Sequence, residues 1–243
     1  MYQTANLYLT AELGVAEVVL GNPRLMMMLE HFNIYVPFQE KSIRQVCIEN
    51  KLSINLFLVF ANLYNGTGFN NSDPVSFDEI RPIIRFLKNS HAYYTEEIMP
   101  DIRQIINDMY EPSNHEDISL IEKFFNEYSK EVIEHLDYED YIAFPYMTDL
   151  YDHIINEKQY DSPVTYSVND YKEHHNDIEE KLTDLKNLLI KYLPQKEDQK
   201  KRRKLYFNLN ELEFDLNIHA IIEDMILVPL VEKMENYLKG KRE

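Results

Sequence analysis

One eleven-residue pattern occurs twice in the sequence. It reads HLDYEDYIAFP at residues 135–145 and HAIIEDMILVP at residues 219–229, so that histidine, glutamate, aspartate, isoleucine and proline return at the same places. A histidine and a glutamate four residues apart lie on the same face of an α-helix, one above the other. Imidazole and carboxylate groups presented together are typical metal ligands. Each copy of the pattern therefore predicts a pair of metal ligands.

Both pairs are expected on helix faces that are otherwise apolar. The face of His135 carries Phe125, Tyr128, Val132 and Ile142, and the face of His219 carries Leu212, Leu216, Ile226 and Leu230. A carboxylate buried among apolar side chains must be paired or bound to a metal, because it loses its hydration. We expect His135 with Glu139, and His219 with Glu223, to point into a helical core.

Two further helices each offer one histidine at a core position. His91 interrupts one apolar stripe, and His175 completes another, whereas the neighbouring His174 lies on a polar face and is the alternative to His175. The stripe of His91 consists of Ile84, Leu87, Tyr94 and Ile98, and that of His175 of Tyr171, Ile178, Leu182, Leu185 and Leu189. A lone inward histidine is ordinarily a hydrogen-bonded core residue. Four helices that each present one, two of them with a glutamate, indicate a shared site.

Six ligands exceed the four that close a structural zinc site. Two ions bridged by two carboxylates use all six, at a separation of about 3.5 to 4 Å, with Glu139 and Glu223 as the bridges. Four imidazoles and two carboxylates suit iron better than manganese or zinc, so we predict a centre of two non-haem iron ions. Asp140 and Asp224 follow the two glutamates, and we expect them to be solvated; the alternative is a role in holding the ligands.

The composition predicts an all-α protein. Five glycines among 243 residues are too few for a many-stranded sheet, whereas long helices need few tight turns. The segment NGTGFNNSDP concentrates loop-forming residues. It is expected to separate a small helical N-terminal domain, residues 1–70, from an antiparallel four-helix bundle, residues 74–243.

Capping patterns predict where the helices of this bundle begin. Spacings typical of capping boxes occur in SFDE at residues 76–79 and in SNHE at residues 113–116, and SVND at residues 167–170 imitates them. The fourth helix is expected to begin between Gln199 and Asn210, after the charged run QKEDQKKRRK, which we interpret as a solvated connector.

Charge and composition exclude several functions. A formal net charge of -17 disfavours a nucleic-acid surface, since phosphate binding needs a basic face. The start MYQTANLYLTAEL lacks the features of a signal peptide, and no apolar run reaches the length of a membrane span. The single cysteine, Cys47, can form no internal disulfide, which suits a reducing compartment. We therefore expect a cytoplasmic protein that contacts neither nucleic acid nor membrane.

The order of the candidate ligands resembles the hemerythrin-like family. Its pattern is a lone histidine, H-x-x-x-E, a second lone histidine and a second H-x-x-x-E on four successive helices, with an apolar residue and proline after each pair, as in FP and VP here. The matching residues are His91 in SHAYYTEEIMP, His135 and Glu139, His175 in EHHNDIEEKL, and His219 and Glu223. The likeness covers residues 77 to about 238, and it implies a four-helix bundle around two iron ions.

A closer likeness is to the bacterial di-iron proteins that repair iron centres, which place a short helical domain before such a bundle. NPRLMMMLEHFNIYVPF followed by SIRQVCIENKLSINLFL looks like that domain, and Cys47 lies where a cysteine is common. Those proteins usually carry a Cys-Cys pair followed by glycines, where this chain has the residues YVPF at positions 35–38. A sulfur-handling or iron-donating step assigned to that pair is therefore not carried over.

The resemblance implies a reaction with oxygen, nitric oxide or peroxide, in nitrosative or oxidative stress response or in iron-sulfur cluster repair. Its partners would be a small diatomic ligand and damaged iron-sulfur proteins. Tyr94 and Tyr128 lie near the ligands and are expected to pack in the core, with a hydrogen bond to a bound diatomic as the alternative. The competing interpretation of the whole chain is a metal-free helical interaction or regulatory module, in which the inward histidines form a polar network.

Overall fold

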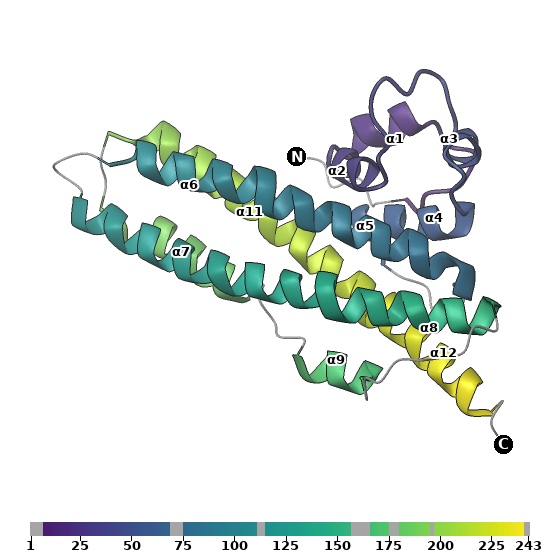
Figure 1. The fold of residues 1–243 in the computed structure, drawn as a ribbon. Coiled ribbons are helices and arrows are strands. Elements are labelled where there is room, and N and C mark those ends of the chain that lie inside the picture. The colour runs from purple at the N-terminus through teal and green to yellow at the C-terminus, as the bar shows by residue number, and fades with distance from the viewer. Residues whose placement is uncertain are drawn as a thin grey trace. The chain divides into compact units, whose positions relative to one another are not determined.

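The computed structural model describes residues 7–68, 75–110, 115–156, 166–174, 180–194 and 197–240 (Figure 1). Every regular element in these ranges is a helix, apart from one isolated bridge between Gly14 and Ser42. The all-α prediction is therefore confirmed. Within the same ranges, no helix has an apolar stretch long enough to cross a membrane.

The chain packs as two compact units. The first comprises Met1–Asn89, Thr148–Tyr160 and Ile221–Glu243, and the second comprises Ser90–Met147 and Asp161–Ala220. Boundaries between these two units fall within long helices. The division into residues 1–70 and 74–243 remains a prediction.

The first unit begins with four short helices: α1 (Val15–Gly21), α2 (Arg24–His31), α3 (Ile43–Glu49) and α4 (Ile54–Tyr64). Ser42 starts α3 with a capping box, and the N-terminal segment is held to α4 by the buried Asn62, whose side chain bonds the N–H and the carbonyl of Leu9. The core contains a group of aromatic rings from Phe32, Phe57, Phe60 and Phe86. The unit also includes η1 (Phe77–Glu79), most of α5 (Ile80–Ala92), most of α8 (Phe144–Asn156), and α12 (Val228–Gly240).

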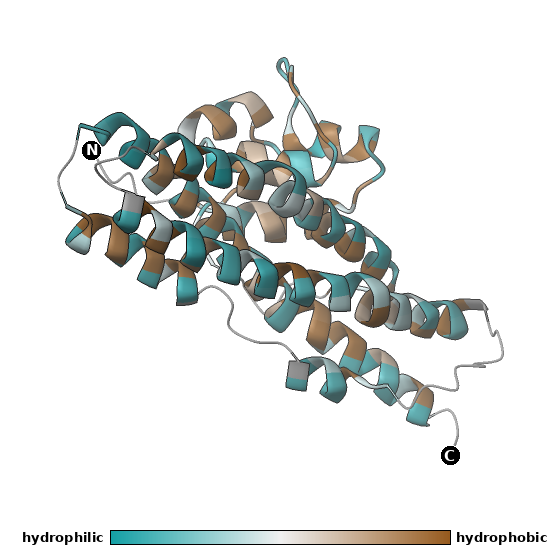
Figure 2. Cartoon of the chain, turned by 60° about the vertical axis from the view of Figure 1, so that its left-hand side comes forward, coloured by the Kyte–Doolittle hydropathy of each residue, from teal (hydrophilic) through white to brown (hydrophobic). Residues whose placement is uncertain are grey.

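The second unit is a helical bundle. Its helices are α6 (Met99–Asp108), α7 (His115–Tyr138), α9 (Val168–His174), α10 (Glu180–Asn187) and most of α11 (Gln199–Ile222). Helices α6 and α7 lie side by side and run in opposite directions (Figure 1). Apolar and polar residues alternate in patches along the long helices (Figure 2). The buried apolar residues of this unit form one core. Its members include Ile102, Ile105, Ile106, Ile121, Phe125, Val132, Leu182, Leu185, Leu205, Leu209, Leu212 and Leu216.

The helix starts agree with the capping patterns where they are described. The Ser76–Glu79 capping box is formed, and the backbone N–H and hydroxyl of Ser167 both donate to Asp170 at the start of α9. Ser113 lies outside the described residues. Helix α11 begins at Gln199, so the second half of the charged run is helical and not a connector. Asp198, just before this helix, is buried and binds Arg202 at 2.6 Å.

In the part of the chain that the structure describes, a π-helical turn occurs shortly before a proline in four places. These turns are η2 (Tyr93–Ile98), η3 (Glu139–Ala143), η4 (Leu188–Tyr192) and η5 (Glu223–Leu227), and each ends two residues before Pro100, Pro145, Pro194 or Pro229. In every case the residue directly before the proline donates its N–H to the carbonyl five positions back. A proline has no N–H, and its ring clashes with the carbonyl four residues back. After η2, η3 and η5 the wider turn accommodates the proline and the helix continues, whereas after η4 the helix ends and Leu193 is extended.

The π turns change which residues face the core. Ile142 was expected on the face of His135, but its side chain is 46% exposed, whereas the next residue, Ala143, is fully buried. In the second copy of the pattern the residue at the position of Ala143, Leu227, is also fully buried, and Ile226 before it is buried as expected. A wider turn advances less around the helix axis per residue, so the inward position moves one residue later.

Candidate metal centre

Glu139 lies at the centre of the candidate site. It is the first residue of η3, and its side chain is 0% exposed. Its Oε1 atom lies 3.3 Å from His135 Nε2, while Oε2 lies 3.4 Å from His91 Nε2 and 4.0 Å from His219 Nε2. One carboxylate therefore faces three imidazoles, which come from α5, α7 and α11.

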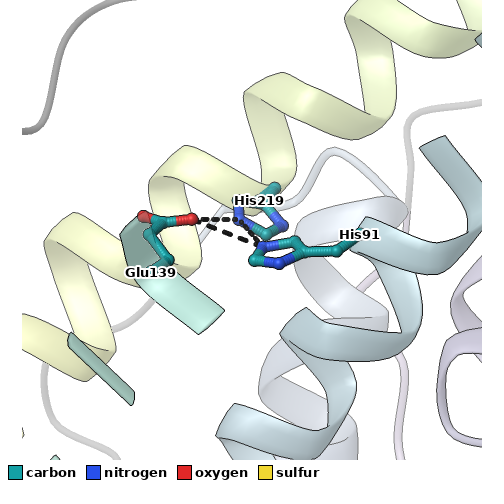
Figure 3. Close-up of side chains that lie close together, drawn as sticks. All are labelled: His91, Glu139 and His219. Carbon is teal, nitrogen blue, oxygen red and sulfur yellow. Dashed lines mark hydrogen bonds and ion pairs between the residues drawn. The ribbon is translucent and has the colours of Figure 1, made fainter. Parts of the chain in front are cut away.

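The two histidines at Oε2 form a compact group with Glu139. His91 and His219 are buried, their Nε2 atoms are 3.4 Å apart, and the ligand atoms of all three residues lie within 4.8 Å of one another (Figure 3). An ion placed among these atoms would receive two imidazole nitrogens and one carboxylate oxygen. This donor set is suited to zinc, iron or manganese.

The same side chains are held by a second set of polar contacts. Ser90 Oγ lies 2.9 Å from His219 Nδ1, and the hydroxyl of the buried Tyr171 donates to Glu139 Oε1 at 2.8 Å. Asp140 Oδ1 lies 3.3 Å from His91 Nδ1, with the Asp140 side chain 28% exposed. The expectation that Asp140 is merely solvated is therefore wrong, because η3 brings its carboxylate to the His91 ring.

The charge on His91 depends on these carboxylates. Burial lowers the pKa of its imidazole, but the neighbouring carboxylates of Asp140 and Glu139 together outweigh this effect and raise the pKa from 6.5 to about 9. Without a metal, His91 is thus an imidazolium at neutral pH, paired with Glu139. A metal at Nε2 would displace that proton, so its affinity would rise with pH.

The remaining predicted ligands are Glu223 and one histidine of the third helix. Glu223 is buried, lies one turn after His219, and begins η5 in the first unit. Asp224, beside it, is exposed as expected. His174 is the last residue of α9, and its side chain is not described; His175 lies outside the described residues. Four of the six predicted ligands are thus seen together in the second unit: His91, His135, Glu139 and His219.

Replacing the third-helix histidines by alanine separates the two alternatives. We expect His175→Ala to lower metal content and His174→Ala to leave it unchanged, because only His175 continues the apolar stripe of Tyr171, Leu182 and Leu185. The measurement is metal per chain in the two purified variants. The reverse ranking would show that the third helix is turned by one residue from the predicted register.

The sequence pattern did not identify three of the polar residues around the site. Ser90 and Tyr171 were not proposed as contacts, and Asp215 was not considered. Asp215 is fully buried and accepts a hydrogen bond of 2.7 Å from Tyr94, whose ring lies edge-on to His219. A signal for Asp215 was available, since it precedes His219 by four residues, the same spacing that selected Glu223. Tyr94 and Tyr128 are buried, in agreement with the expected core packing.

Comparison of the chain with models of protein families, with curated proteins and with solved structures finds no significant match. The resemblance to a family therefore depends on the residue pattern alone.

Proposed function

We propose that this chain is a hemerythrin-like, non-haem di-iron protein with an antiparallel four-helix bundle. The observation that carries the proposal is the position of Glu139, whose two oxygens face different imidazoles in a buried site. A carboxylate that bridges two ions needs this arrangement, with one group of nitrogen ligands at each oxygen. A fully buried carboxylate also needs positive charge nearby to offset its lost hydration.

The residues of the chain would have distinct tasks at such a centre. His91 and His219 would hold one ion at Oε2 of Glu139, and His135 would hold the other at Oε1. Glu223 and His175 would complete the set, as the sequence pattern predicts. The Phe144 ring stacks on His91 at 5.6 Å, and the apolar core of the bundle limits the access of water. Two bound iron ions would supply a redox-active centre with coordination positions open to a small molecule.

The proposed reaction partner is oxygen, nitric oxide or peroxide, and the proposed role is stress response or repair of iron-sulfur centres. This part is supported only by the resemblance to the iron-centre repair proteins. The structure places Tyr35 and Val36, in the stretch where those proteins carry two cysteines, on the surface. A reagent could thus reach this stretch, but it offers no thiol, so we assign the chemistry to the bundle alone.

Metal analysis combined with absorption spectra tests this proposal. Protein purified without chelators is expected to contain about two iron ions per chain. Exposure to oxygen and then, in a reduced sample, to nitric oxide should change the near-ultraviolet and visible absorption of the iron. A sample that contains a single zinc ion, or no metal after growth with ample iron, would refute the di-iron centre.

One observation favours the alternative of a metal-free helical module. The carboxylates of Glu139 and Asp140 both lie against the His91 ring, so the site is a charged network that balances its own charge in part. The iron analysis separates the two functions, because the network needs no metal. If the metal-free protein is as stable as protein incubated with metal, that result would support the metal-free polar network.

Cys47 is expected to take no part in the chemistry. It is buried in α3, and burial raises the pKa of its thiol from 9.0 to about 12, with a smaller opposing effect from Arg44. The thiol is therefore neutral at pH 8 and should react with a thiol reagent only after unfolding. The buried thiol favours the folded state only while it is neutral. Because its folded pKa is raised, the contribution of the neutral Cys47 thiol to stability is fully present below pH 9 and is lost as the pH rises toward 12.

Cys47→Ser should keep the iron content and the nitric oxide spectrum of the unchanged protein. The hydroxyl placed in an apolar core will cost about 1–3 kcal/mol of stability, and Cys47→Ala provides a control without that hydroxyl. If both variants retain iron but lose the spectral change, the N-terminal helices take part in the reaction.

A further inference from the structure

We infer that Asp140 is a positioning residue, which holds the His91 ring so that Nε2 faces Glu139 and the metal position. The inference rests on the proposed function, since it concerns the outer contacts of the same site. Two contacts on opposite sides of the His91 ring support it: Nδ1 is 3.3 Å from Asp140 Oδ1, and Nε2 is 3.4 Å from Glu139 Oε2.

An imidazole can bind a metal only through a nitrogen that carries no proton. Its other nitrogen then carries the proton, and a neighbouring acceptor decides which nitrogen this is. An aspartate carboxylate at Nδ1 favours the form with the proton on Nδ1 and the lone pair on Nε2. Asp140 thus holds a proton on the Nδ1 side of the ring, so that Nε2 is the nitrogen that binds an ion once the imidazolium has lost its other proton.

Ser90 has the corresponding position at His219. Its Oγ lies 2.9 Å from His219 Nδ1, which leaves Nε2 directed at Nε2 of His91, 3.4 Å away. The two rings are therefore held from outside, one by a carboxylate and one by a hydroxyl. A carboxylate makes its imidazole the more electron-rich ligand of the two, so His91 should be the stronger donor.

The two copies of the repeated pattern differ at this position. Asp140 and Asp224 both follow a predicted bridging glutamate, yet Asp140 contacts a ligand histidine while Asp224 is exposed. The His91 ring is further fixed by Phe144, four residues after Asp140, which stacks on it with an angle of 23° between the planes. The residues at positions 140 and 144, one helical turn apart, thus hold the edge and the face of the same ring.

The first test uses zinc alone as the probe and compares Asp140→Asn with Asp224→Asn. Both substitutions remove one negative charge from the same position of the repeated pattern. Asp140→Asn is expected to weaken zinc binding by about 10- to 100-fold. Asp224→Asn is expected to leave zinc affinity within about 2-fold, the range usual for a surface substitution. Equal affinities for the two variants, in folded protein, would overturn the inference. Circular dichroism and thermal melting of each variant establish that it is folded.

The second test reads the ring directly in metal-free protein. Nitrogen NMR of labelled histidine at about pH 10, above the ordinary range for imidazole, reports which nitrogen carries the proton, with His91→Gln used to assign the signal. In the unchanged protein and in Asp224→Asn the proton should reside on Nδ1, and in Asp140→Asn it should be shared between the nitrogens. An unchanged ratio in Asp140→Asn would refute the positioning role even if zinc binds. No binding of zinc or iron to the unchanged protein would refute the proposed function instead, and the NMR result would still decide the role of Asp140.

Discussion

Glu139→Gln is expected to abolish metal binding. Glutamine has nearly the same shape as glutamate, but it is neutral, and its amide nitrogen can only donate where an oxygen now faces an imidazole. Two cations would then lose the carboxylate that lies between their histidines and that offsets their charge. Iron content should fall from about two ions per chain to a trace, and the absorption changes with oxygen and nitric oxide should disappear.

Glu134→Gln is the matched control for this experiment. Glu134 lies on α7, five residues before Glu139, is 64% exposed and pairs with Lys130 on the surface. The control variant should retain full metal content. If Glu139→Gln, folded by circular dichroism, still binds two ions, then Glu139 does not bridge them and the arrangement of ligands proposed here is wrong.

Removal of the metal should lower the melting temperature by about 5 to 11 °C. A ligand present at 100 times its dissociation constant adds about 2.7 kcal/mol to the stability of the folded state. For a chain of 150 to 250 residues, each kcal/mol corresponds to about 2 to 4 °C. Glu139→Gln serves as the control, because a variant that binds no metal should show the same melting temperature with and without a chelator.

The fall in melting temperature on removal of the metal should depend on pH. In the metal-free protein, protonated His91 contributes stability that is fully present below pH 6.5 and is lost as the pH rises through about 9, because its folded pKa is raised. Metal binding needs the neutral His91 ring, so the affinity for the metal rises over the same pH range. The difference in melting temperature between loaded and metal-free protein should therefore widen from pH 6.5 to pH 9. A constant or narrowing difference would show that His91 is not a ligand.

The spacing of the histidines and glutamates selected the candidate ligands, and composition and caps predicted the helices. His135 and Glu139 are four residues apart on one turn, which any α-helix brings together, so this contact did not depend on tertiary structure. His91 and His219 required an inference about buried faces, and that inference was correct because each interrupts a long apolar stripe. The contact between these two histidines then followed from the packing of those faces.

The residues that were missed have tertiary causes. Asp140 and Asp224 occupy the same position of the repeated pattern, each directly after a glutamate, and the packing of the helices distinguishes them: Asp140 lies against His91, whereas Asp224 is exposed. Ser90 is a small residue before a candidate ligand, and nothing in its spacing marks a hydrogen bond to a histidine 129 positions away. Ile142 was misplaced because a regular α-helical periodicity was applied across a π turn.

The π turn before the proline of each repeated pattern affects how its residues should be aligned with those of other chains. A π turn is one additional residue in an α-helix, and one residue corresponds to about 100° of rotation. The letters before the turn and those after it thus belong to two different phases of the same helix. A deletion of one residue between Glu139 and Pro145 would bring the two phases together and rotate the remainder of the helix, whereas a substitution of Pro145 alone would leave the extra residue in place. An alignment that treats the pattern as an uninterrupted helix will therefore match His135 and Glu139 correctly and misplace the side chains that follow them.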